Sequence, residues 1–325
     1  MIIHQITQIN NTLPYKSYLA TKENYKEVLD KYGVCVIPNI LTEYECIAYR
    51  NCLWNDINFL TKKRFNIDDI NSWYNFYDLF PIHSMLIQHF SIAHSQTVWN
   101  IRQHEEIGKI FADIWSVPKE ELFSSYDGIS ISLPPEHTYR GWYRGTEWLH
   151  TDQSPLKKGF NCIQGLVNLY PVNDGDSTLS VLEGSHKYHS DFFDSINNKD
   201  KNDWYKLEPN EKKFFINKGC NQYCVSAPIG SLVLWDSRTI HQGIEAQSTR
   251  SNENFRMAIY TCLTPKYKFS NNDIKRRDIA FQTLRLTNHW GKKIFPKYPR
   301  TYGKPIKEFN KFVTPILTTY GHSLK

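Results

Sequence analysis

The sequence predicts a mainly β protein with flanking helices, whose core is a double-stranded β-helix of the jelly-roll or cupin kind. Short apolar or alternating segments, separated by turn residues, follow one another between about residues 126 and 265. Patterns of helical period lie mainly before residue 125. No linker clearly divides the 325 residues, so we expect a single domain, 1–325, with a helical N-terminal part of about 1–125, a jelly-roll core of about 126–265 and a C-terminal extension of about 266–325.

The N-terminal part contains recognisable helix boundaries. A first helix is predicted over residues 21–32, with Thr21 as its cap and Gly33 ending it. In the segment after Thr42, apolar residues recur at helical spacing as far as about Leu60. The other elements expected here are a buried strand over 34–37 and a helix over about 103–115.

Strand patterns dominate the middle of the chain. Ile129 to Leu133 alternates between apolar and polar residues and ends at two prolines, and the segment from Arg256 to Cys262 also has strand period. Strands are further expected over 160–170, 178–182 and 230–235. The polar segment 191–219 is interpreted as a long insertion between strands, which can cover a site as a lid.

Composition excludes several classes of protein. The formal net charge is +6, from 39 basic and 33 acidic residues, and no nucleic-acid-binding signature accompanies it. We therefore interpret the excess as a solvated basic surface, with nucleic acid an improbable partner. The first residues do not resemble a signal peptide, and no apolar run is long enough to span a membrane.

The seven cysteines are odd in number and irregularly spaced, and several lie in apolar stretches. Buried, reduced thiols in a cytoplasmic, reducing environment fit this pattern best. Cys220 and Cys224 have no matching Cys/His pair at zinc-finger spacing, so we do not predict a zinc site there.

The triplet His150-Thr151-Asp152 and the later His241 are the main chemical signal. Because side chains alternate along a strand, His150 and Asp152 share one face while Thr151 points away. Two imidazoles and one carboxylate form the ligand set of non-haem Fe(II) oxygenases, which leaves positions open for a co-substrate and for O2. A lone His-X-Asp triplet is a weak signal, and His150 and Asp152 as ordinary turn residues is the alternative.

The flanking sequence makes this signal more specific. The chain resembles the phytanoyl-CoA dioxygenase-like branch of the Fe(II)/2-oxoglutarate-dependent oxygenases, over about residues 25–265. The motifs that carry the resemblance are Tyr32-Gly33-Val34-Cys35-Val36-Ile37-Pro38-Asn39, His150-Thr151-Asp152-Gln153-Ser154-Pro155, Leu182-Glu183-Gly184-Ser185-His186-Lys187, Gly230-Ser231-Leu232-Val233-Leu234-Trp235-Asp236, His241 and Arg256.

The resemblance implies roles for individual residues. His150, Asp152 and His241 would bind Fe(II), and Arg256 would bind the distal carboxylate of 2-oxoglutarate, because a guanidinium makes paired hydrogen bonds to a carboxylate. Arg256 lies slightly farther from His241 than the family pattern suggests, so Arg250 is the alternative; Arg256 can also be a strand-edge arginine paired with a glutamate.

Three further polar residues have two interpretations each. Gln164 and Asn168 lie on a strand expected to face the barrel interior, where one of them contacts 2-oxoglutarate or both are satisfied core amides. His186, in the Gly-Ser-His motif, is interpreted as a structural turn residue and not as a metal ligand.

The resemblance implies hydroxylation of a small organic molecule, with O2 as oxidant and decarboxylation of 2-oxoglutarate to succinate. A cluster of basic and aromatic residues just before His150 would favour an anionic or planar substrate, although a solvated loop with aromatic anchors explains it equally well. The cluster consists of Arg140, Trp142, Tyr143, Arg144 and Trp148. The alternatives are an oxygenase acting on a protein or nucleic acid, and a non-catalytic jelly-roll binding module.

Overall fold

Two six-stranded sheets form the centre of the protein in the computed structural model, which describes residues 12–80, 85–300, 303, 305 and 307–325. The first sheet has the order β1 (Tyr15–Ser17), β10 (Gln222–Ser226), β8 (Thr178–Leu182), β12 (His241–Ile244), β6 (His150–Thr151) and β9 (Tyr205–Lys206). The second has the order β2 (Val34–Ile37), β11 (Leu232–Asp236), β7 (Ile163–Asn168), β13 (Arg256–Tyr260), β5 (Ile129–Ser132) and β3 (Met85–Ile87). Neighbouring strands are antiparallel except for β1 and β10. The prediction of a sheet-rich protein with flanking helices is therefore confirmed.

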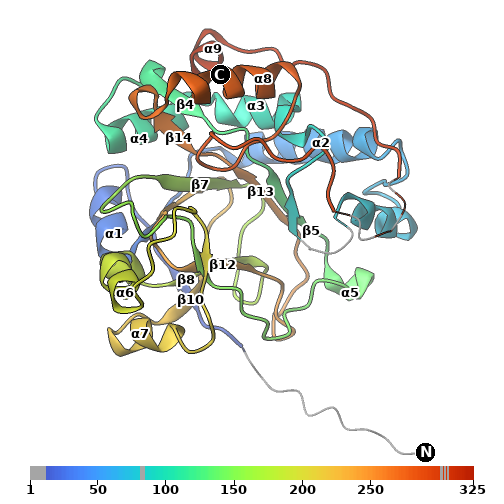
Figure 1. Ribbon diagram of the computed structural model, residues 1–325. Helices are drawn as coiled ribbons and strands as arrows, with labels where there is room; N and C mark the ends of the chain where they lie inside the picture. Colours follow the sequence, from blue (N-terminus) through green and yellow to red (C-terminus); the bar gives the residue numbers. More distant parts are fainter. Residues whose placement is uncertain (1–11, 81–84, 301–302, 304, 306) are drawn as a thin grey trace, which may run out of the picture.

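Helices surround the sheets and are concentrated on the side of the second sheet, where α2, α3 and α8 lie above β7 and β13 (Figure 1). The α-helices are α1 (Tyr25–Tyr32), α2 (Glu43–Leu60), α3 (Gln96–Arg102), α4 (Glu105–Trp115), α5 (Pro135–Thr138), α6 (His189–Ser195), α7 (Lys212–Asn217), α8 (Asn271–Gln282) and α9 (Thr319–Leu324). Shorter 3-10 turns are η1 (Ile70–Leu79), η2 (Ile92–His94), η3 (Lys119–Glu121), η4 (Ser185–Tyr188) and η5 (Lys266–Lys268). A small third sheet pairs β14 (Leu263–Pro265) with β4 (Leu122–Ser124).

Separate apolar clusters fill the spaces between these layers. Leu166 and Trp235 from the second sheet pack with Val181 from the first, so the inner faces of the two sheets share one core. A larger cluster joins the outer face of the second sheet to the helices above it, with fully buried Phe76, Trp99 and Phe111.

The helix boundaries agree with the capping signals except at the first helix. The second helix, α2, begins after Thr42 as predicted. Thr42 caps it, accepting a hydrogen bond from the Glu45 amide while the Glu45 side chain accepts one from the Thr42 amide. At α1 the predicted start is wrong: the helix begins at Tyr25, and Thr21 instead opens a turn in which its amide donates to the Asn24 side chain. Gly33 ends α1 as predicted, with φ of 77° and its amide donating to the Leu29 carbonyl.

The remaining predicted elements all occur, several of them with shorter bounds than predicted. The strand predicted over 160–170 is β7, and the one over 256–262 is β13. The helix predicted over 103–115 begins at Glu105, because Gln103 ends the preceding helix α3.

The predicted insertion is folded onto the first sheet. It carries α6, β9 and α7, and β9 pairs with the short strand β6, placing Lys206 opposite His150 and Tyr205 opposite Thr151. Its apolar residues, including Phe192 and Phe215, share a cluster with Leu149. The segment is thus a structured wall next to His150.

The C-terminal extension is integrated into the helical layer. Arg277 of α8 is fully buried and donates to the Ser124 and Leu324 carbonyls, which connects α8 to β4 and α9. Farther along, Thr287 exchanges hydrogen bonds with Tyr126. The extension thereby returns to the segment that leads into β5.

All seven cysteines are free thiols, and six of them are buried. Among the described residues, no helix has the length and apolar character needed to cross a bilayer.

Two buried histidines predict a pH-dependent stability. Burial lowers the pKa of His94 to about 3 and that of His189 to about 4, from an ordinary value of 6.5. Below pH 6.5 the unfolded chain therefore binds protons that the folded chain does not, so stability falls as pH falls toward these folded-state values. Two such groups give a loss approaching ~3 kcal/mol per pH unit near pH 5. Urea unfolding at pH 7.5, 6 and 5 measures it, and equal stability at the three values would contradict this account.

Candidate metal centre

The structure brings His150, Asp152 and His241 together. His150 opens β6, Asp152 follows that strand, and His241 opens β12, directly opposite His150 in the antiparallel pair. The Thr151 side chain points the other way and donates to the Ser237 carbonyl. His150, Asp152 and His241 are buried, and one possible ligand atom from each lies within 4.8 Å of the other two.

The ring nitrogens of both histidines are arranged for metal binding. Nδ1 of His241 lies 2.9 Å from the Thr239 carbonyl and Nδ1 of His150 lies 3.2 Å from the Trp148 carbonyl. A carbonyl can only accept, so each Nδ1 carries the proton and each Nε2 keeps a lone pair. The Nε2 atoms of His241 and His150 lie 3.3 Å and 3.7 Å from Oδ2 of Asp152. Three donor atoms thus face a common point.

Neighbouring groups hold the carboxylate of Asp152 in place. The Gln164 side-chain amide donates to Oδ2 at 2.9 Å. The Asp152 amide donates to the Ser237 carbonyl, and its own carbonyl accepts from the Trp290 indole at 3.1 Å. Burial opposes ionisation of this group, but the imidazoles of His289 and His150 outweigh burial and hold the pKa of Asp152 well below its usual range. The carboxyl group of Asp152 is therefore ionised, as it must be to bind a metal ion.

Arg256 is a buried cation on β13, with 5% of its surface exposed. Its Nε donates to the Ser130 hydroxyl at 2.9 Å and its Nη1 to the Ser177 carbonyl at 3.2 Å. Glu253, one of the glutamates that could have paired with it, lies against His137 instead. An arginine buried without a counter-charge has the character of an anion-binding group.

Arg250 has the opposite environment. Its guanidinium makes paired hydrogen bonds to the Glu136 carboxylate and lies 3.2 Å from Oδ1 of Asp176. Its donors are also used by the Asn254 carbonyl. Two carboxylates thus already neutralise Arg250. Which of the two arginines binds 2-oxoglutarate remains a prediction.

The two amides on β7 differ in their surroundings. Gln164 contacts Asp152, so its hydrogen bond serves the carboxylate of the centre. Asn168 is buried at the other end of β7, opposite Ala258 of β13. Contact of either side chain with 2-oxoglutarate remains a prediction.

His186 lies outside the centre. Its Nε2 is 2.9 Å from the Asp30 carbonyl, and the ring packs where a side chain at Gly33 would collide with it. His186 thus connects the η4 turn to the end of α1.

The C-terminal extension supplies two residues that sequence reasoning missed. Besides the Trp290 indole on the Asp152 carbonyl, Nδ1 of His289 lies 4.0 Å from Oδ2 of Asp152. Nε2 of His289 is buried and has no hydrogen-bond partner among the described residues. The adjacent pair His289-Trp290 follows no strand or motif in the sequence, so only the tertiary structure reveals it.

The cluster predicted to line the entrance is divided by the fold. Trp148 stacks on the His150 imidazole, with ring centres 4.7 Å apart and an angle of 15°. Arg140 instead lies over the Tyr77 ring, and Trp142 lies under Arg250. Of these residues, Trp148 alone has a recorded contact with the predicted ligands, and a second tryptophan, Trp204 of the insertion, has its ring centre 6.0 Å from that of His150.

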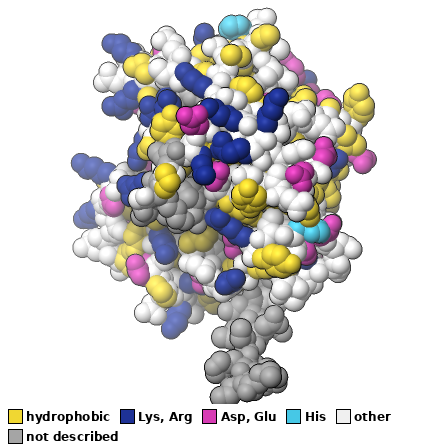
Figure 2. All heavy atoms as spheres, turned by 90° about the vertical axis from the view of Figure 1, so that its right-hand side faces the viewer, with side chains coloured by type: hydrophobic (Ala, Val, Ile, Leu, Met, Phe, Trp, Pro, Cys, Tyr) yellow, Lys and Arg dark blue, Asp and Glu magenta, His cyan; other side chains and the backbone are white. Residues whose placement is uncertain are grey.

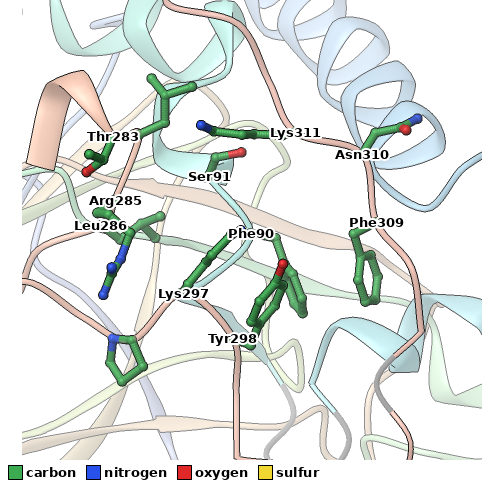
Figure 3. A pocket seen from close by; sticks show the side chains of 12 residues that line it. Phe90, Ser91, Thr283, Arg285, Leu286, Lys297, Tyr298, Phe309, Asn310 and Lys311 are labelled. Carbon is green, nitrogen blue, oxygen red and sulfur yellow. The ribbon is translucent and has the colours of Figure 1, made fainter.

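A small hollow of about 120 Å³ lies elsewhere, between the β3–η2 connection and the C-terminal segment (Figure 3). Phe90, Tyr298 and Phe309 form its aromatic side, and Arg285 and Lys297 contribute cations. Its lining includes none of the residues of the metal-type centre, so we do not assign it to the same chemistry.

Comparison with known proteins shows one relative in sequence. No family model matches the chain. The "Ava biosynthesis cluster protein O" of Aspergillus versicolor is 31% identical over 209 residues, which cover 62% of this chain and 65% of that protein. The chain thus aligns with slightly less than two thirds of the length of this relative.

Solved structures show the fold. A hypothetical protein of Escherichia coli, JW0805, superposes with a TM-score of 0.58 at 12% identity, over 95% of this chain and 85% of the other. SnoK, whose structure is described as that of a non-heme alpha ketoglutarate dependent carbocyclase from nogalamycin biosynthesis, gives a TM-score of 0.49 at 16% identity, over 75% of this chain and 83% of the other. The likeness to the E. coli protein shows a shared fold, and at these identities it extends no further.

Proposed function

We propose that the protein is an Fe(II)/2-oxoglutarate-dependent oxygenase that oxidises a small organic molecule by hydroxylation. The observation that carries the proposal is the convergence of two Nε2 atoms and one carboxylate oxygen at the end of two paired strands. Two histidines and one carboxylate on one face are the ligand set of non-haem iron oxygenases. We also propose the double-stranded β-helix arrangement of that class, and membership of its phytanoyl-CoA dioxygenase-like branch, from the order of the sequence motifs.

The residues present fit the cofactor. His150, Asp152 and His241 would hold the iron. The Nδ1 protons of the two histidines are already taken by backbone carbonyls, which leaves both Nε2 lone pairs for a metal beside the Asp152 carboxylate. When bound, iron would supply the redox chemistry that couples decarboxylation of 2-oxoglutarate to oxidation of the substrate by O2. The hydrogen bonds from each histidine Nδ1 to a backbone carbonyl orient the ligands, and bonds of this kind typically raise metal affinity 10–100-fold.

Arg256 would bind the distal carboxylate of 2-oxoglutarate. Its guanidinium lies in the inner space between the sheets, where a dicarboxylate would neutralise a cation that lacks a carboxylate partner. The Ser130 and Ser177 oxygens fix its orientation. Gln164 would keep the Asp152 carboxylate aligned, and His289 and Trp290 would close one side of the centre.

A macromolecular substrate is the second candidate, suggested by the excess of basic residues. Figure 2 shows Lys and Arg side chains on one face interspersed with acidic and apolar ones, and we see no continuous basic groove on that face. The predicted ligands are also buried, which fits a small substrate better. A non-catalytic binding module has no need for both a buried His/Asp/His group and a buried Arg256 without a carboxylate partner.

The proposal is tested by product formation. The anaerobically purified chain, supplied with Fe(II), 2-oxoglutarate and then O2, is expected to form succinate and CO2 in equal amounts, measured by mass spectrometry. Succinate should not form without Fe(II) or without O2. The His150→Ala variant should lose the activity, whereas His137→Ala should keep it, because His137 pairs with Glu253 at the surface. Succinate at the parent rate from His150→Ala would show the ligand assignment to be wrong.

A further inference from the structure

Trp204 is an exposed indole next to a predicted metal ligand. About 53% of its surface is exposed, although its ring centre lies only 6.0 Å from that of the His150 imidazole. Most tryptophans bury a large part of their surface, and a single exposed one needs no explanation by itself. Its position beside the metal-type triad is what makes this one informative.

The insertion fixes the backbone on both sides of Trp204. Before it, the Asp203 carboxylate accepts from the Ser154 amide at 3.0 Å and pairs with Lys157 at 2.6 Å. After it, Tyr205 pairs with Thr151 in the β6–β9 ladder, and the Tyr205 hydroxyl donates to Glu211. The indole is therefore presented by an ordered backbone segment, which is tied to β6 on one side and to Ser154 and Lys157 on the other.

A second indole lies on the same imidazole. Trp148 is nearly parallel to His150, at 15°, and its position is fixed by hydrogen bonds to the Gln242 side chain and the Gly243 carbonyl. The Trp204 ring is tilted by 38° from the imidazole, so it does not stack on it as Trp148 does. Trp148 thus holds the His150 imidazole in place, while the exposed Trp204 has ring surface left for another planar group.

Resting on the proposed function, we propose that Trp204 is a substrate-binding residue and that the preferred substrates contain a planar aromatic ring system. Such a ring stacks on the exposed indole and is held beside the metal centre. An aliphatic ring of the same size lacks the flat π-face and cannot make this contact as well. The contact places the substrate at the wall formed by the insertion, which gives that segment a role in specificity.

The test compares 2-naphthol with decahydro-2-naphthol, its saturated counterpart. Each is titrated by calorimetry into the full chain loaded with Mn(II) and 2-oxoglutarate under argon, so that no turnover occurs. We expect the parent protein to bind 2-naphthol about tenfold more tightly than the saturated probe. Trp204→Ala should remove this difference, Trp204→Phe should retain most of it, and both variants should bind Mn(II) and 2-oxoglutarate as the parent does.

A matched control is Tyr44→Ala, which removes an 82% exposed aromatic ring from α2 and should change none of these affinities. The proposal is overturned if the parent binds the two probes equally or binds neither, or if Trp204→Ala keeps the preference for 2-naphthol. Failure of the parent to bind Mn(II) and 2-oxoglutarate would count against the proposed function instead. In that case the same titration of the metal-free chain still decides the role of Trp204.

Discussion

Replacement of Asp152 by alanine is expected to weaken metal binding by more than 100-fold and to abolish succinate formation. The reason is that Asp152 is the only carboxylate in the buried group and both Nε2 atoms face its Oδ2. Loss of a residue that merely orients a ligand already costs about 10–100-fold, so loss of a ligand should cost more. Mn(II) binding measured by calorimetry, and succinate measured after exposure to O2, check both parts.

Two further variants make this result interpretable. Asp152→Asn keeps an oxygen that can accept from Gln164, so the fold should be preserved while the charge is lost. Asp194→Ala removes an exposed carboxylate from α6 and should bind Mn(II) as the parent does. Parent-like Mn(II) affinity in both Asp152 variants would mean that the metal-type group is not a metal site.

Replacement of Arg256 by glutamine is expected to weaken 2-oxoglutarate binding by about 100-fold without changing Mn(II) affinity. Removing one partner of a buried charge pair typically weakens binding by ~2–5 kcal/mol, and a 100-fold loss of affinity falls within this range. The protein without co-substrate should lose no stability, because a buried cation without a carboxylate partner is itself costly. Calorimetric titration of 2-oxoglutarate and thermal unfolding of the unliganded chain measure the two effects.

Arg250→Gln is the matched control for this prediction. Arg250 is paired with Glu136 and Asp176, so its loss should lower stability by ~3 kcal/mol and leave 2-oxoglutarate affinity within a few fold of the parent. The reverse outcome, with affinity lost at Arg250 and kept at Arg256, would exchange the two assignments.

Much of the fold could be predicted because local signals and tertiary structure agree. The capping pair Thr42 and Glu45 gives a start of α2 that needs no distant partner, and the alternation of β13 reflects one face on the inner core and one on the helices. Thr21 misled because a threonine that opens a turn has the same local sequence as one that caps a helix.

The candidate site could be predicted only where strand period and motif coincide. His150 and Asp152 follow from the period of two, and His241 from the apolar strand before it. His289 and Trp290 could not be predicted, because they lie in a turn after α8 that carries no sequence motif and reaches Asp152 only through the tertiary structure. Trp204 was missed because the polar insertion looks like a flexible cover, whereas its pairing with β6 is a tertiary contact.

The most direct test of the central claim is an anaerobic calorimetric titration of the chain with Fe(II) and 2-oxoglutarate in both orders. One Fe(II) should bind per chain, and 2-oxoglutarate should bind tightly only after the metal, because the proposed function makes the triad and Arg256 parts of one site. His241→Ala should eliminate both events. Equal 2-oxoglutarate binding with and without metal, or Fe(II) binding that survives in His241→Ala, would contradict the account.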